Sequence, residues 1–204
     1  QPIQRGAVNL MTAGSGIVHS ERAGDDLDET SRLHGIQSWM ALPESEDERE
    51  AAFQHYPAAD LPDIDVNGVN VRVIIGDAFG HASPVHAYSS TLYLECVMPA
   101  GSELILPDQY DEIAAYIVSG SVSIDGRSFG EGVMAVASAG AAMKLTAEAE
   151  SRVMVIGGEP LGKRHIYWNF VSSSKERIEQ AKQDWRERRF GKVPGENEFI
   201  PLPD

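Results

Sequence analysis

Two side chains that can bind a metal, His19 and Glu21, stand two residues apart just after a Gly-x-Gly turn. Residues two apart in an extended strand share a face, so the imidazole and the carboxylate can point into one cavity. A mixture of histidine and carboxylate with open coordination positions suits non-haem iron or a similar divalent metal, whereas structural zinc sites normally recruit thiolates. The spacing also fits a solvated pair on a strand. We interpret His19 and Glu21 as half of a metal site.

Further short motifs continue from this pair along nearly the whole chain. The residues from Met11 to Glu21 read Met-Thr-Ala-Gly-Ser-Gly-Ile-Val-His-Ser-Glu. Later motifs are Leu33-His-Gly-Ile-Gln37, Ala41-Leu-Pro43, Ser83-Pro-Val85, Gly157-Gly-Glu-Pro-Leu161 and Arg189-Phe-Gly191. Together they resemble the pirin family of bicupins, whose first barrel carries an iron-type site of three histidines and one glutamate. The resemblance places His19 on the third histidine of that site and Glu21 on the glutamate.

The same resemblance indicates what the printed sequence does not contain. Pirins supply their first two histidines from an upstream His-Pro-His-Arg-Gly motif, and no such motif occurs here. The sequence also starts at Gln1 without a methionine. We therefore expect an N-terminal part of the first barrel to precede residue 1, and we expect the chain as written to be inactive and to hold metal weakly.

Composition limits the class of protein. The 204 residues are 42% hydrophobic, which is enough for one or two buried cores. A net charge of −14 opposes the counterion release that drives nucleic-acid binding, so we expect no direct contact with nucleic acid. The single cysteine cannot form an internal disulfide, and no apolar run is long enough for a membrane span. We expect a soluble cytoplasmic protein without a membrane partner.

Short alternating strands separated by tight turns dominate the middle of the chain. Asn67-Gly68 and Asp125-Gly126 are both dipeptides that favour the type I′ hairpin turn. The run Leu92, Leu94, Cys96 and Met98 alternates as a half-buried strand does, and we interpret Cys96 as a core thiol rather than a reactive one. The regular spacing of strands and turns predicts an all-β fold. Together with the resemblance, the pattern predicts an all-β bicupin of two jelly-roll barrels, the first incomplete, with a C-terminal helix.

An internal repeat distinguishes the two barrels. Gly6 matches Gly132 and Gly14 matches Gly140 at the same separation of 126 residues. At this separation His19 falls on Leu145 and Glu21 on Ala147, so we expect the second barrel to be structural and free of metal. Four polar residues in its region Pro99 to Gly120 could bind a metal in isolation, but we interpret them as a surface loop: Asp108, Gln109, Asp111 and Glu112.

Several segments between these landmarks have simpler interpretations. We expect His19 and His34 to lie in strands, the second running to Leu42, with His34 hydrogen-bonded rather than a ligand. The acidic residues 24–29 lack the regular ligand spacing of a calcium loop, so a solvated loop is expected there. The charged run 44–53 indicates a short surface helix.

The C-terminal residues change character. Ser173-x-x-Glu176 fits a capping box, and Ile178, Ala181 and Trp185 follow on one side of a helix that we expect to end at Phe190-Gly191. This stripe should dock on a barrel, with Arg186, Arg188 and Arg189 outside. We predict three parts: residues 1–62, the C-terminal part of the first, metal-binding cupin domain; 63–171, a second, metal-free cupin domain; and 172–204, a helix and tail.

Two functions of different class follow from the resemblance. The first is a metal-dependent dioxygenase that cleaves flavonols such as quercetin in its intact form, with Glu21 as the catalytic residue, acting as ligand or as base. The alternative is a non-enzymatic, iron-dependent regulator that binds a transcription-related or other protein partner. Both require Fe(II) or another divalent transition metal at His19 and Glu21, so these residues do not separate them.

Overall fold

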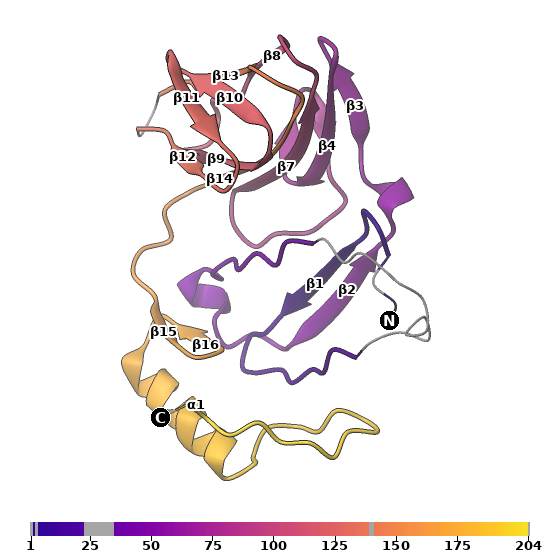
Figure 1. Cartoon of the computed structure of the whole chain (residues 1–204). Coiled ribbons are helices and arrows are strands. Elements are labelled where there is room, and N and C mark those ends of the chain that lie inside the picture. The colour runs from indigo at the N-terminus through magenta and orange to yellow at the C-terminus, as the bar shows by residue number, and fades with distance from the viewer. Residues whose placement is uncertain (1, 3, 23–34, 139–140, 204) are drawn as a thin grey trace. The chain divides into compact units, whose positions relative to one another are not determined.

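The computed structural model describes the chain except for residues 1, 3, 23–34, 139–140 and 204 (Figure 1). Contacts divide it into two compact units: a barrel unit, Gln4–Val8 with His55–Pro160, and a terminal unit, Gln1–Ile3 and Asn9–Gln54 with Leu161–Asp204. The C-terminal residues thus group with the N-terminal ones. The three domains predicted for the chain, 1–62, 63–171 and 172–204, stay a prediction.

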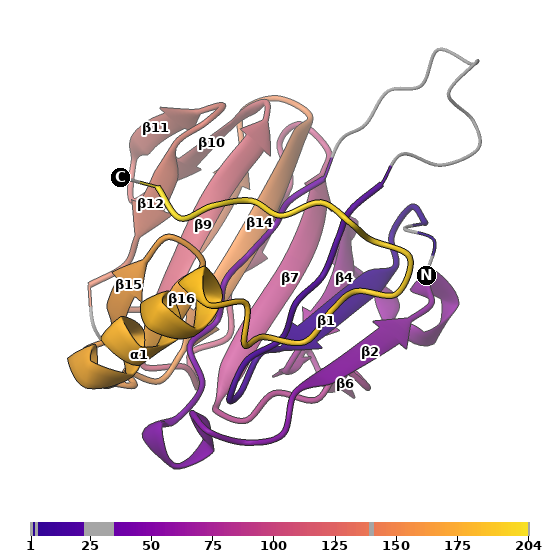
Figure 2. The same ribbon diagram turned by 90° about the horizontal axis from the view of Figure 1, so that it is seen from below.

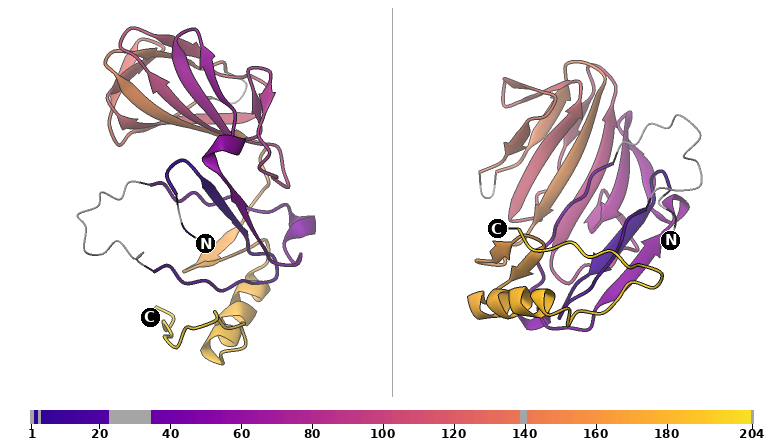
Figure 3. Two further views of the ribbon diagram at one scale, coloured as in Figure 1. Left: turned by 90° about the vertical axis from the view of Figure 1, so that its right-hand side faces the viewer. Right: turned by 60° about the horizontal axis from the view of Figure 1, so that its bottom comes forward.

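The barrel unit is built from two antiparallel sheets and a short strand pair, β5 (Asp77–Ala78) with β6 (His81–Ala82) (Figures 1 and 3). The six-stranded sheet has the order β12 (Met134–Val136), β9 (Glu112–Ser119), β14 (Ser151–Gly158), β7 (Thr91–Met98), β4 (Val69–Ile75) and β3 (Asp63–Val66). The four-stranded sheet has the order β11 (Arg127–Gly130), β10 (Ser121–Ile124), β13 (Lys144–Ala147) and β8 (Glu103–Ile105). The predicted all-β barrel is therefore confirmed for these residues.

Alternation along the strands builds the barrel core. Every second residue of β7 is buried, and the central strands of both sheets contribute fully buried side chains such as Val71, Leu94 and Leu145 to one apolar cluster. Each such side chain contributes about 1.5–3 kcal/mol by leaving water. Cys96 is 0% exposed, and burial raises the pKa of its thiol to about 12, which confirms a core cysteine that stays protonated.

Both predicted hairpin turns are confirmed by their backbone angles. Asn67 and Gly68 have φ of 53° and 83° between β3 and β4, and Asp125 and Gly126 have φ of 50° and 73° between β10 and β11. Two successive positive φ values are the signature of the type I′ turn, whose twist matches that of the strands it joins.

The predicted repeat is visible in the local structure. Gly6 (φ 73°) and Gly132 (φ 80°) each form a turn that is followed, two residues later, by a strand. These strands are β1 (Val8–Thr12) and β12, whose first residues are separated by the same 126 positions. Gly140, the partner of Gly14, lies outside the described residues.

Regular elements outside the barrel sheets are short (Figure 2). They are two-stranded sheets of β1 with β2 (Ala52–Tyr56) and of β15 (His165–Tyr167) with β16 (Phe170–Ser172), 3₁₀ helices at Glu44–Glu46 and Ala58–Asp60, and α1 (Lys175–Arg186). In the part of the chain that the structure describes, no helix has the length and apolarity needed to cross a membrane.

Three local predictions were wrong. Residues 13–22 and 35–43 lie outside any strand, so His19 is not in one. His34, at the start of the second predicted strand, lies outside the described residues. The predicted loop of residues 24–29 lies outside them as well. A single 3₁₀ turn replaces the surface helix expected over residues 44–53, and Phe53 belongs to β2. The aromatic residues Phe53 and Tyr56 favour an extended conformation once a partner strand such as β1 is present.

The C-terminal helix is confirmed, but its limits differ from those predicted. Its N-cap is Ser174, whose Oγ accepts from the Arg177 backbone N–H at 3.2 Å. Ser173 instead donates through its Oγ to Asp47 at 2.5 Å. The helix ends at Arg186, before the expected stop, and it packs on the β15–β16 hairpin of the terminal unit.

Candidate functional site

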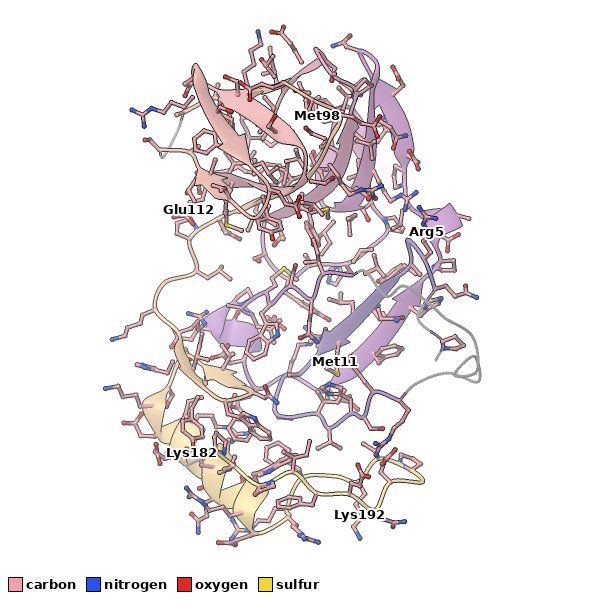
Figure 4. All side chains as sticks on the ribbon, viewed as in Figure 1. Arg5, Met11, Met98, Glu112, Lys182 and Lys192 are labelled. Carbon is pink, nitrogen blue, oxygen red and sulfur yellow. The ribbon has the colours of Figure 1, made fainter. Side chains whose placement is uncertain are left out.

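The predicted ligands lie on an irregular segment, residues 14–22, which we name the ligand segment. β1 leads into it, and Figure 4 labels Met11 on that strand. Gly14 has φ of 51°, and a Cβ at this position would overlap the Arg49 carbonyl oxygen, which accepts from the Ser15 N–H at 2.9 Å. Gly16 has φ of 140°, and a Cβ there would lie 2.7 Å from the Phe190 ring. Both positions therefore require glycine, which accounts for the Gly-x-Gly pattern.

His19 and Glu21 themselves are exposed. Within the described ranges, neither side chain takes part in a hydrogen bond or an ion pair. Their ring nitrogens and carboxylate oxygens are thus available to a ligand, and this pair of donor types suits a divalent transition metal.

The described residues bring no third ligand to this pair. Among them, no group of three or more His, Cys, Asp or Glu side chains is arranged to hold a metal ion. His19 and Glu21 fit two positions of the four-ligand site that the family resemblance implies, and their role as metal ligands stays a prediction.

The start of the ligand segment is held by the C-terminal part of the chain. Arg177 of α1 donates to the Ser15 carbonyl at 2.7 Å and also pairs with Glu48 at 2.7 Å. Phe190 packs against Gly16, as the glycine geometry requires. A small open cavity of about 210 Å³ lies between these groups and is lined in part by Asp184 and Arg189, which bind each other at 2.8 Å.

The end of the ligand segment is held by the residues that follow α1. Glu196 forms a two-pronged ion pair with Arg22, accepting from its Nε at 2.8 Å and also from its Nη2, and Glu198 accepts from Nη2 at 2.9 Å. Glu196 also accepts from Ser20 Oγ at 3.2 Å. The hydrogen bonds from Arg22 lower the pKa of Glu196, and the two glutamates raise the pKa of Arg22. Sequence reasoning missed both glutamates, although their charge opposes that of Arg22.

An aromatic cluster supports these C-terminal residues, and sequence reasoning missed it as well. Trp185 lies at its centre, with ring-centroid distances of 5.1 Å to Trp168, 5.5 Å to Phe190 and 5.4 Å to Phe199. Phe170 stacks on Phe190 at 5.8 Å. The cluster joins the β15–β16 hairpin, α1 and the tail, and the concentration of Trp and Phe between residues 168 and 199 was the available signal.

Comparison with known proteins identifies the family. Residues 1–40 match the family model described as Pirin, and residues 93–191 match the Pirin C-terminal cupin domain. The chain is 46% identical over 200 residues to a pirin-like protein of Caulobacter vibrioides, with 97% of the chain and 69% of that protein covered. The chain belongs to the pirin family.

Other pirins and solved structures agree with this assignment. Pirin-1 of Arabidopsis thaliana is 31% identical, with 93% of the chain and 67% of that protein covered. A crystal structure of quercetin 2,3-dioxygenase from Acinetobacter baumannii is 28% identical and superposes with a TM-score of 0.90 over 100% of the chain and 69% of that structure. The chain spans between 61% and 69% of the length of the first curated relatives.

The barrel unit of this pirin presents apolar side chains at the positions that match the predicted ligands. Leu145 is 0% exposed and Ala147 is 2% exposed, both in β13 and both part of the core. The predicted surface loop is confirmed for Asp108, Gln109 and Asp111, which are exposed, while Glu112 begins β9.

The same unit contains an open cavity of about 290 Å³, lined mainly by small and hydroxyl side chains. Asp77 and Tyr110 both line it, and the Tyr110 hydroxyl donates to the Asp77 carbonyl at 3.0 Å, while the neighbouring Gln109 donates to the Asp77 carboxylate at 2.9 Å. Burial is the main cause that raises the pKa of Tyr110, so its hydroxyl stays protonated and serves a structural role at neutral pH.

Proposed function

We propose that this pirin is a metal-dependent dioxygenase that cleaves flavonols of the quercetin type, with His19 and Glu21 among its metal ligands. The pair itself carries the proposal: it lies within residues 1–40, which match the Pirin model, and neither side chain bonds to another described residue. The likeness to the quercetin 2,3-dioxygenase of Acinetobacter baumannii supports the substrate class.

The two side chains have different roles in this proposal. His19 would hold the metal through a ring nitrogen. Glu21 offers a carboxylate that either binds the metal or accepts the proton of the flavonol hydroxyl group, the proton that must leave before the ring is attacked. When bound, a divalent transition metal supplies Lewis-acid and redox chemistry towards the flavonol and O₂.

The decisive experiment measures quercetin consumption and O₂ uptake by the protein as the cell makes it, loaded with Fe(II). Glu21→Gln removes the proton acceptor and keeps the side-chain size, so turnover should fall on the order of 10²-fold or more. Asp108→Asn is the matched control, because it neutralises an exposed carboxylate in the barrel unit and should leave turnover unchanged.

Two outcomes would contradict the proposal. One is full turnover by the Glu21→Gln variant, which would remove this residue from the chemistry. The other is a protein that holds one equivalent of iron and consumes no flavonol. The second result would favour the non-enzymatic, iron-dependent regulator.

A further inference from the structure

The residues on either side of Glu21 are bonded to the C-terminal tail, which we define as residues 193–203. Ser20 and Arg22 both donate to Glu196, and Arg22 also donates to Glu198. Residues 17–22 form no regular secondary structure. In the sequence, Ser20 follows His19 directly, and Ser20 and Arg22 stand on either side of Glu21. Contacts that hold Ser20 and Arg22 therefore restrain the backbone from which the His19 and Glu21 side chains extend.

The tail is itself attached to α1, so its carboxylates are presented from a fixed backbone. Phe199 stacks on Trp185 with ring centroids 5.4 Å apart, and the Arg188 guanidinium lies 4.5 Å from the centre of the Phe199 ring. The Trp185 Nε1–H donates to the Ile200 carbonyl at 2.8 Å. A second hydrogen bond, from the Tyr167 hydroxyl to the Pro203 carbonyl, measures 2.8 Å.

The attachment of the tail to α1 lowers the entropy cost of the exposed ion pairs between Arg22 and the tail. An isolated surface ion pair is weak, because two flexible side chains must be ordered to form it. Here the tail is already anchored near Glu198 by ring stacking and by the hydrogen bond from the Trp185 side chain to the Ile200 carbonyl, so less freedom is lost when Arg22 binds. The paired N–H groups of Arg22 also match the two oxygens of Glu196, which fixes orientation as well as distance.

We infer that the C-terminal tail is a positioning latch for the ligand segment. Glu196 and Glu198 hold Ser20 and Arg22, and this contact orients His19 and Glu21 towards a bound metal. Phe190 and Arg177 fix the start of the same segment, so the latch needs to restrain only its far end. The orienting role rests on the proposed function, whereas the contact between tail and segment does not.

The test compares the protein as the cell makes it with a variant carrying Glu196→Gln and Glu198→Gln. Amide hydrogen exchange of residues 15–22, measured without metal, should become faster in the variant, while exchange in α1 stays unchanged. The dissociation constant for Fe(II) should rise about 10-fold or more, as happens when groups that orient metal ligands are lost. Arg22→Gln should reproduce both effects, and adding it to the double variant should change little further.

Glu103→Gln is the matched control. It removes an exposed glutamate that pairs with Lys144 at 2.7 Å in the barrel unit, and it should change neither measurement. Unchanged exchange in residues 15–22 of the variant with Glu196→Gln and Glu198→Gln would contradict the inference that the tail holds the ligand segment. Faster exchange with an unchanged dissociation constant would overturn its orienting role. A parent protein that binds no Fe(II) would sink the proposed function and the orienting role together, while the exchange result would still decide whether the tail holds the segment.

Discussion

The barrel unit and the terminal unit are held together by different kinds of contact. In the barrel unit, central strands such as β7 and β13 have a hydrogen-bonded partner on each side, and their inward side chains are apolar and buried. In the terminal unit, aromatic rings and ion pairs connect short elements, and the few buried aliphatic residues include Ile178 and Ala181 of α1.

Residues that correspond in the repeat show the same contrast. Leu145 belongs to β13, between β8 and β10, whereas His19 belongs to a segment that pairs with no strand within the described residues. Backbone pairing with β8 and β10 fixes the position of Leu145. Side chains from distant parts of the sequence fix the position of the ligand segment that carries His19. The proposed metal ligands, His19 and Glu21, therefore lie in a segment whose position depends on a few side-chain contacts. Substitutions can remove these contacts one at a time.

The largest stability change should come from Trp185→Ala. This ring contacts Trp168 of the hairpin loop, Phe190 and Phe199 of the tail, so its loss should cost roughly 3–5 kcal/mol of unfolding free energy. Chemical denaturation followed by circular dichroism measures it. Trp39→Ala is the matched control, because Trp39 is 57% exposed. A loss below about 1 kcal/mol would mean that the aromatic cluster does not hold the terminal unit together.

A somewhat smaller change is expected from Leu145→Ala in the barrel. The substitution leaves a cavity in a packed core and should cost roughly 2–5 kcal/mol, measured by the same denaturation. Ile105→Ala, in the adjacent strand β8, is the control: Ile105 is 63% exposed, so its loss should cost less than about 0.5 kcal/mol. Metal content should stay the same in both variants. A change in metal content on Leu145→Ala would break the contrast between a structural barrel and a ligand segment.

Local signals explain what could be predicted from the sequence. Asn67-Gly68 predicts its turn because few other dipeptides tolerate two positive φ values, and the alternation from Leu92 to Met98 predicts a strand with one buried side. These features depend on neighbouring residues alone.

Features that depend on distant partners could not be predicted. The strand expected at His19 needs flanking strands, which the described residues do not provide. Glu196 and Phe199 acquire a role only because α1 and the ligand segment meet them in space. Ser173 and Ser174 are chemically identical cap candidates, and the contact of Ser173 with Asp47 decides between them.

The smallest effect concerns that cap. Ser174→Ala removes the acceptor for the Arg177 N–H, so unfolding should become easier by about 1 kcal/mol. Ser174→Asp should restore most of the loss, because aspartate is also a good N-cap. Thermal or chemical denaturation distinguishes the two variants. An equal loss in both would indicate that the hydroxyl acts through its bond to Glu176 rather than through the cap.

Elemental analysis of the protein as the cell makes it tests most directly whether the ligand segment, and not the barrel, holds the metal. We predict about one equivalent of divalent metal per chain, and none after His19→Ala together with Glu21→Ala, because Leu145 and Ala147 supply no donor atoms in the barrel. Two tightly held equivalents per chain, or one that survives the double substitution, would contradict the account.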